Sequence, residues 1–180
     1  MERKAIVILE EYVLKNLINH SENNPEIECG GFLFGRIAPI KDGVIHCHVN
    51  GIYSHYGIPA SDENFEFREE YLRHANNWGE KENLQIIGIY HSHVVCQPTP
   101  SKQDLKLYNT FFPMEGLSII YNPSQGIHAD YICRDAVIVG NDIYVKHKDG
   151  SYEMINNIFD HSHTVKVRRR NSLQMKGNMI

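Results

Sequence analysis

The sequence predicts an α/β fold in which a mixed β-sheet is flanked by helices. Short apolar segments typical of strands alternate with segments of helical periodicity, and the alternation does not follow a strict strand–helix–strand repeat. The chain of 180 residues, 42% of them hydrophobic and 22% charged, is long enough for one domain with a single core. We therefore expect one sheet, covered by helices, to organise most of the chain.

The first half of the chain is expected to contain three strands and two helices. Three apolar segments are typical of short strands: residues 5–9, 30–36 and 44–49. Two segments carry apolar side chains at helical spacing: residues 10–20 and 65–78. Gly79 is the expected stop of the second helix, since glycine is common just after a helix end.

The second half begins with the segment that we expect at the centre of the sheet. Residues 84–90 are almost continuously apolar, which suits a strand that is covered on both faces. After a loop at residues 94–100, Ser101 is the expected N-cap of a third helix, because the pattern Ser-x-x-Asp places Asp104 in its first turn. Four further short strands are expected: residues 117–121, 128–133, 136–139 and 142–145.

Composition excludes several classes of protein. The formal charge of −4 gives no whole-protein reason to bind nucleic acid, and the basic run at residues 166–170 is interpreted as a solvated end. The apolar run before Glu10 is too short for a secretory or membrane segment, so no membrane association and a cytoplasmic location are expected. The four cysteines lie far apart and predict neither a disulfide framework nor a zinc ribbon.

Two histidines at the end of the predicted central strand indicate a metal site. His91 and His93 are separated by one residue, so both side chains project from the same face of the strand. A catalytic zinc ion needs three protein ligands and an open fourth position. Asp104 is the third ligand that we expect, because the loop stiffened by Pro98 and Pro100 returns the first turn of the next helix to the strand end.

A hydrolase of this kind also needs polar groups that are not ligands. Glu28, just before the glycine pair Gly30-Gly31, is the candidate proton carrier for a zinc-bound water. The Ser101 hydroxyl lies beside the third ligand, where it can cap the helix and hydrogen-bond a developing oxyanion. Read alone, Glu28 would be an exposed carboxylate near a turn, and Ser101-x-x-Asp104 would be a helix cap only.

Taken together, these elements resemble the JAMM motif of MPN-domain (JAB-type) zinc metalloproteases of the bacterial stand-alone type. The resemblance is carried by His91-Ser-His93, by Ser101-x-x-Asp104 after seven residues, and by the upstream segment Glu28-Cys-Gly-Gly-Phe-Leu-Phe-Gly. It implies one zinc ion on His91, His93 and Asp104 with a bound water as fourth ligand, acid/base work by Glu28 and oxyanion stabilisation by Ser101. It also implies a cytidine-deaminase-like fold. This sequence departs from the usual family pattern at Val94, where proline is common, and at Gly30, where cysteine is common.

The resemblance also implies a reaction and partners. The reaction is hydrolysis of the amide or isopeptide bond after the C-terminal glycine of ubiquitin or a ubiquitin-like protein, by a deconjugase or processing enzyme. The implied partners are that ubiquitin-like protein or its conjugates, with the matching activating and conjugating enzymes. Two alternatives stay open: a peptidase acting on a sulfur-carrier protein or short peptides, and a catalytically silent MPN interaction scaffold. The domain is expected at residues 1–150, followed by a partly flexible extension at residues 151–180.

Other candidate groups are interpreted as structural. His46-Cys-His48 and His161-Ser-His163 have ligand spacing, but neither is followed by a Ser-x-x-Asp helix start. Cys96, inside the expected metal loop, is interpreted as a loop thiol rather than as a ligand or redox switch. The sequence has neither a Gly-x-Ser-x-Gly nor a Walker-type phosphate motif, which argues against a serine hydrolase and a nucleotide-binding protein.

Overall fold

The computed structural model of the protein describes residues 4–39, 44–54, 68–95, 97–98, 100–111, 115–133, 136–138 and 141–155. Three helices lie within these residues: α1 (Glu11–Glu22), α2 (Glu69–Glu82) and α3 (Lys102–Phe111). The strands within them are β1 (Lys4–Glu10), β2 (Gly30–Pro39), β3 (Val44–Ser54), β4 (Gln85–Ser92), β5 (Glu115–Asn122), β6 (Gly126–Cys133), β7 (Ala136–Ile138), β8 (Asp142–Lys146) and β9 (Tyr152–Ile155).

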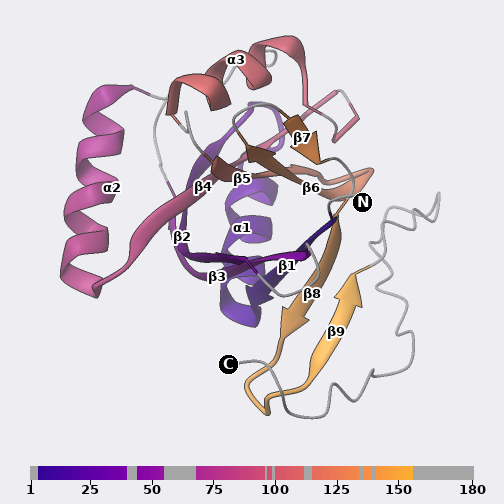
Figure 1. Cartoon of the computed structure of the whole chain (residues 1–180). Helices are drawn as coiled ribbons and strands as arrows, with labels where there is room; N and C mark the ends of the chain where they lie inside the picture. Colours follow the sequence, from indigo (N-terminus) through magenta and orange to yellow (C-terminus); the bar gives the residue numbers. More distant parts are fainter. Residues whose placement is uncertain are drawn as a thin grey trace.

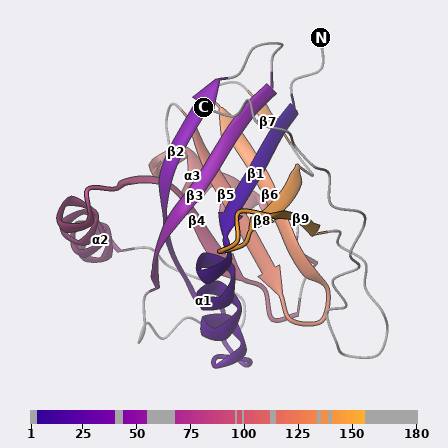
Figure 2. The ribbon, with the colours of Figure 1, turned by 90° about the horizontal axis from the view of Figure 1, so that it is seen from below.

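All of these strands belong to one sheet of mixed direction, in the order β7-β6-β5-β4-β2-β3-β1-β8-β9. The pairs β1–β3, β1–β8 and β4–β5 are parallel, and the other neighbouring pairs are antiparallel. Figure 1 shows that the sheet curls around α1, whereas α2 and α3 lie outside the curl. In Figure 2, α1 follows directly from the end of β1. The predicted mixed sheet flanked by helices is confirmed.

The two faces of the sheet have separate apolar cores because side chains alternate along each strand. In β2, Leu33 belongs to the core inside the curl, where α1 contributes Val13 and Leu17. Phe32 and Phe34 of the same strand point to the other face and pack with residues of α2 and α3, namely Tyr71, Ala75 and Tyr108. Both faces of β2 are therefore apolar, which explains why this strand has no polar alternation.

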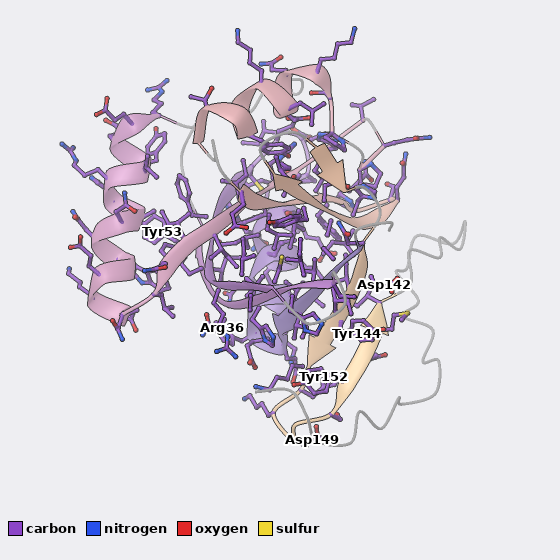
Figure 3. The ribbon with its side chains drawn as sticks, in the orientation of Figure 1. Arg36, Tyr53, Asp142, Tyr144, Asp149 and Tyr152 are labelled. Carbon is purple, nitrogen blue, oxygen red and sulfur yellow. The ribbon has the colours of Figure 1, made fainter. Side chains whose placement is uncertain are left out.

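The strand β4 lies near the middle of the sheet, between β2 and β5. Its residues from Ile87 onward are all buried, as predicted for a strand covered on both faces. Tyr90 is fully buried, and its hydroxyl hydrogen-bonds His20 and Ser54. The opposite end of the molecule from α3 is formed by β8 and β9, where Figure 3 places Tyr144 and Tyr152.

The predicted stop of α2 at Gly79 is wrong, because the helix continues to Glu82. Gly79 is buried against the sheet, where an added Cβ would lie 2.5 Å from Cε1 of Phe34 and 2.8 Å from the carbonyl oxygen of Leu84. This glycine therefore permits close packing of helix and strand. The helix ends instead at Asn83, whose left-handed φ of 55° is tolerated by asparagine.

Two strands, β3 and β9, also differ clearly from the prediction. The strand β3 continues to Ser54, beyond its predicted end at residue 49. The strand β9, which was not predicted, pairs with β8 and lies beyond the expected domain boundary at residue 150. The division at that residue stays a prediction, and residues 156–180 lie outside the described residues. Among the described helices, none combines the length and the apolar character that a membrane span needs.

Candidate metal centre

The first two candidate ligands leave the C-terminal end of β4. His91 lies in the strand and His93 directly follows it, where the backbone N–H of His93 still donates to the carbonyl oxygen of Tyr121 in β5. The two residues are 1% and 4% exposed, and their Nε2 atoms lie 3.0 Å apart. Two buried imidazoles thus face each other at the strand end where the sequence predicted a pair of nitrogen ligands.

The third candidate comes from the first turn of α3. The Ser101 hydroxyl accepts a hydrogen bond from the Asp104 backbone N–H at 3.1 Å, and the Ser101 N–H donates to Oδ2 of Asp104 at 2.7 Å. This reciprocal pair is a capping box and confirms Ser101 as the N-cap. Asp104 is thereby held with Oδ1 3.2 Å from Nε2 of His91 and Oδ2 3.6 Å from Nε2 of His93.

The other ring nitrogens of the two histidines also have partners. Nδ1 of His93 lies 2.6 Å from the carbonyl oxygen of Gln97, and Nδ1 of His91 lies 3.5 Å from the hydroxyl of Tyr108. Because a carbonyl oxygen only accepts, Nδ1 of His93 carries a proton, so Nε2 is the nitrogen whose lone pair can face a cation at the centre. Sequence reasoning missed Gln97 and Tyr108, and no sequence pattern marks a backbone carbonyl or a buried hydroxyl as a partner of a histidine.

The charges of the centre favour a cation. Burial acts to raise the pKa of Asp104, but hydrogen bonds with His91, His93 and Ser101 hold it well below its usual range. Burial acts to lower the pKa of His93, whereas its hydrogen bonds with Asp104 and Gln97 and the charge of Glu28 raise it. Both shifts show that the carboxylates stabilise positive charge at this place.

The spacing of the ligand atoms fits a tetrahedral metal site. Ligand bonds of about 2.0 to 2.1 Å place the ligand atoms of a tetrahedral zinc ion about 3.3 to 3.4 Å apart. Nε2 of His91 lies 3.0 Å from Nε2 of His93 and 3.2 Å from Oδ1 of Asp104, and one candidate ligand atom from each of the three residues lies within 4.8 Å of the other two. Among the described residues, His91, His93 and Asp104 form the group of histidine and carboxylate side chains that could hold a metal ion.

Glu28 lies on the same side of the sheet as this group. The β2–β4 register pairs Gly30 with His91, and continuing it by two residues puts Glu28 opposite His93. Glu28 is 9% exposed, so it is not the exposed carboxylate that its local sequence suggests. The structure thus brings all five predicted residues, Glu28, His91, His93, Ser101 and Asp104, to one end of β4, while their chemical roles stay predictions.

The other histidine pairs have different settings. His46 and His48 lie on β3 with ring centroids 6.1 Å apart, and burial lowers the pKa of both imidazoles. They are not part of a three-residue metal-binding group among the residues that the structure describes. His161, His163 and Cys96 lie outside the described residues.

A curled mixed sheet around one helix, with a His-x-His strand end facing a Ser-x-x-Asp helix start, defines the JAMM/MPN class of domain. A sequence profile of the prokaryotic homologues of the JAB domain matches residues 10–139. The chain belongs to this family.

Individual relatives agree with this assignment. The chain is 31% identical over 102 residues to a desampylase of Pyrococcus furiosus, an alignment that spans 57% of this chain and 66% of the relative. It is 29% identical over 128 residues to COP9 signalosome complex subunit 5 of Yarrowia lipolytica, spanning 68% of this chain and 35% of that protein. The chain thus covers less than two thirds of the length of either relative.

A solved structure supports the fold independently. The solution structure of protein DSY2949 from Desulfitobacterium hafniense superposes with a TM-score of 0.62 at 18% sequence identity. The match covers 88% of this chain and 98% of that one. At this identity the comparison bears on the fold alone.

Proposed function

We propose that the chain is a zinc-dependent peptidase or isopeptidase that hydrolyses the bond after the C-terminal glycine of a ubiquitin-like protein. The observation that carries this proposal is the convergence of His91, His93 and Asp104, whose candidate ligand atoms all lie within 4.8 Å of one another. The family supports it, since the JAMM motif implies zinc and this reaction, and one relative is named a desampylase.

The geometry of the three side chains supports the proposed ligand role. His91 and His93 offer Nε2, and Asp104 offers Oδ1 while its Oδ2 accepts from the Ser101 backbone N–H. When bound, a zinc ion supplies Lewis-acid polarisation of a carbonyl and lowers the pKa of a coordinated water to about 7.

Proton transfer and oxyanion stabilisation are assigned to the two non-ligand residues. Glu28, buried on the metal side of the sheet, takes a proton from the attacking water and returns it to the leaving amine. Ser101 is exposed at the start of α3, where its hydroxyl can donate to the oxyanion that forms on the scissile carbonyl. The chain's own residues thus cover binding, proton transfer and charge stabilisation.

The substrate class rests on the family resemblance. A ubiquitin-like tail is extended, so it can add as a strand beside an exposed edge of protein backbone, with small residues next to the metal. The alternative substrates, a sulfur-carrier conjugate or short peptides, differ in the group that follows the glycine. The same residues would hydrolyse each of them.

The decisive experiment combines metal analysis with cleavage. Purified protein is analysed for zinc, then incubated with a ubiquitin-like protein fused through its C-terminal glycine to a reporter, with and without a chelator. We expect about one zinc ion per chain and cleavage that stops on chelation and returns when zinc is restored. A protein that holds no zinc and cleaves neither fusions nor isopeptide conjugates would instead be an interaction scaffold.

A further inference from the structure

Ser92 lies between the two candidate ligand histidines, but its side chain points to the opposite face of β4. It is 2% exposed and belongs to the strand end that also carries His91. Because side chains alternate, Ser92 faces the inside of the curl while His91 and His93 face the metal centre. Its hydroxyl therefore cannot contact a metal ion or a substrate at that centre, and its contacts must explain its burial.

Among the described residues, the Ser92 hydroxyl hydrogen-bonds to Cys29, which directly follows Glu28. The Ser92 backbone N–H donates to the carbonyl oxygen of Cys29 at 2.7 Å. The Cys29 backbone N–H donates in return to the Ser92 hydroxyl at 2.9 Å, and that hydroxyl donates to the Cys29 sulfur at 3.5 Å. Cys29 is itself buried, so water does not provide a substitute partner for its N–H.

This arrangement extends the pairing of β2 with β4 beyond the last regular pair, Gly30 with His91. In a regular antiparallel pair the two opposed residues exchange backbone hydrogen bonds. Here the side-chain hydroxyl of Ser92 accepts the second of these bonds, from the Cys29 N–H. The N–H and the carbonyl oxygen of Cys29 are thus both hydrogen-bonded to Ser92 of β4, one residue before β2 begins.

The hydrogen bonds between Cys29 and Ser92 determine where Glu28 lies. Opposed residues of an antiparallel pair project to the same side, so fixing Cys29 against Ser92 places Glu28 beside His93 on the metal side. The electrostatic effect of Glu28 on the pKa of His93 is consistent with this proximity. Residues 24–29, between α1 and β2, belong to no helix or strand, and the hydrogen bonds between Cys29 and Ser92 attach this segment to β4 next to Glu28.

We propose that Ser92 is a positioning residue of the hydrolytic site: its hydroxyl holds the backbone of Cys29 and thereby sets the separation between the Glu28 carboxylate and the metal centre. The inference rests on the proposed function and adds a residue that acts through Glu28 without touching the reacting atoms. A displacement of a catalytic group by about 1 Å can lower turnover about 100-fold, so the hydroxyl has a measurable role.

The test uses the full chain loaded with zinc and a ubiquitin-like fusion as substrate. For Ser92→Ala we expect kcat to fall about 100-fold, with KM within about three-fold of the parent and an unchanged zinc content. Ser92→Thr, which keeps the hydroxyl, is expected to restore most of kcat, and Ser92→Cys, a weaker acceptor of similar size, to be intermediate. The matched control is Ser21→Ala, since Ser21 is also buried and touches the Cys29 sulfur but not its backbone.

Two further measurements distinguish a positioning role of Ser92 from a general loss of structure. In a Glu28→Gln background, Ser92→Ala is expected to cause no additional loss of residual turnover, because the two residues act as one unit. By amide hydrogen exchange, Ser92→Ala is expected to speed exchange at Cys29 about ten-fold or more while Ile119 in β5 stays protected. This second readout needs no activity.

The outcomes separate the two proposals. An active parent whose Ser92→Ala variant keeps full kcat, or loses it only together with zinc, overturns the positioning role alone. The role is equally overturned if Ser21→Ala lowers kcat as much as Ser92→Ala does. A parent chain that holds zinc but cleaves no ubiquitin-like substrate overturns the proposed function and, with it, the role of Ser92.

Discussion

The Nε2 atoms of His91 and His93 face each other at 3.0 Å, and a carboxylate oxygen of Asp104 lies beside each of them. Two bare ring nitrogens at this separation repel each other unless a proton or a cation lies between them. The negative charges of the Asp104 and Glu28 carboxylates stabilise such a positive charge. Metal binding at this place is therefore expected to affect the stability of the folded chain.

Zinc is expected to stabilise the folded chain. At a free zinc concentration about 100 times the dissociation constant, the free energy of unfolding rises by about 2.7 kcal/mol, and a chelator removes this gain. Thermal unfolding with zinc and with chelator measures it. His93→Ala should abolish the response, whereas His48→Ala, a half-buried histidine of β3, should retain it. An equal response of both variants would place the metal elsewhere.

Replacing the carboxylate of Glu28 by the isosteric amide is expected to separate metal binding from turnover. Glu28→Gln should keep its zinc and lose activity by a factor of about 100 to 10,000, the usual contribution of a positioned acid or base. His91→Ala should lose both zinc and activity. Metal analysis and initial rates on the same samples check this. Equal activity of Glu28→Gln and the parent would remove Glu28 from the mechanism.

Ser101 has two roles that substitutions can separate. Ser101→Ala should lower the free energy of unfolding by about 1 kcal/mol through loss of the N-cap. It should also lower kcat about 100-fold through loss of the oxyanion donor. Ser101→Asp restores a capping oxygen but cannot donate, so it should recover stability without recovering kcat. Urea unfolding and steady-state rates test both. A Ser101→Ala variant with reduced stability and full kcat would leave Ser101 as a cap only.

Gly88 is expected to tolerate substitution by alanine less well than Gly150 does. An added Cβ at Gly88 would lie 2.2 Å from the carbonyl oxygen of Leu117, so Gly88→Ala must push β4 away from β5, at a cost of about 3 kcal/mol or more. Gly150 has open space around its Cα and a φ of 85°, so Gly150→Ala should cost only about 1 to 2 kcal/mol of backbone strain. Urea unfolding compares them. A smaller loss for Gly88→Ala would contradict the tight β4–β5 contact.

Stability at alkaline pH is expected to depend on Cys47. Burial raises the pKa of this thiol to about 12 in the folded chain, from 9.0 for an ordinary thiol. The stabilising effect of the buried, protonated thiol is complete below pH 9, and it is lost as the pH rises from about 9 to 12, because only the unfolded chain releases the proton in that range. The free energy of unfolding then falls by up to about 1.4 kcal/mol per pH unit.

The control for this pH dependence is Cys47→Ala. The variant should be less stable at neutral pH, because a buried side chain is truncated, but its stability should fall less steeply above pH 9. Urea unfolding at several pH values compares the slopes. Parallel slopes for the variant and the parent would show that Cys47 does not titrate as proposed.

The sequence predicted the order of the elements and the residues at the end of β4 because both depend on local patterns. Alternation, helical periodicity and the Ser-x-x-Asp cap place β4, α3 and His91 without reference to the rest of the chain. What could not be predicted depends on contacts between distant segments. The packing of Gly79 on Phe34 and the pairing of β9 with β8 belong to this group, as do the contacts of Tyr108 and Gln97 with the histidines.

The burial of Glu28 is the most instructive of these differences. Its local sequence, between a proline-containing turn and two glycines, resembles a surface loop. Its position is determined by Ser92, which is 64 residues away in the sequence, so that only the pairing of the two strands reveals it.

Both oxygens of the Asp104 carboxylate face the histidines, Oδ1 at His91 and Oδ2 at His93, and Oδ2 also accepts from the Ser101 N–H. An ion bound at Asp104, as proposed, should therefore stabilise the first turn of α3, and fraying of that turn should weaken ion binding. Loss of the ion should then lead first to local unfolding of this turn, before the sheet itself loosens.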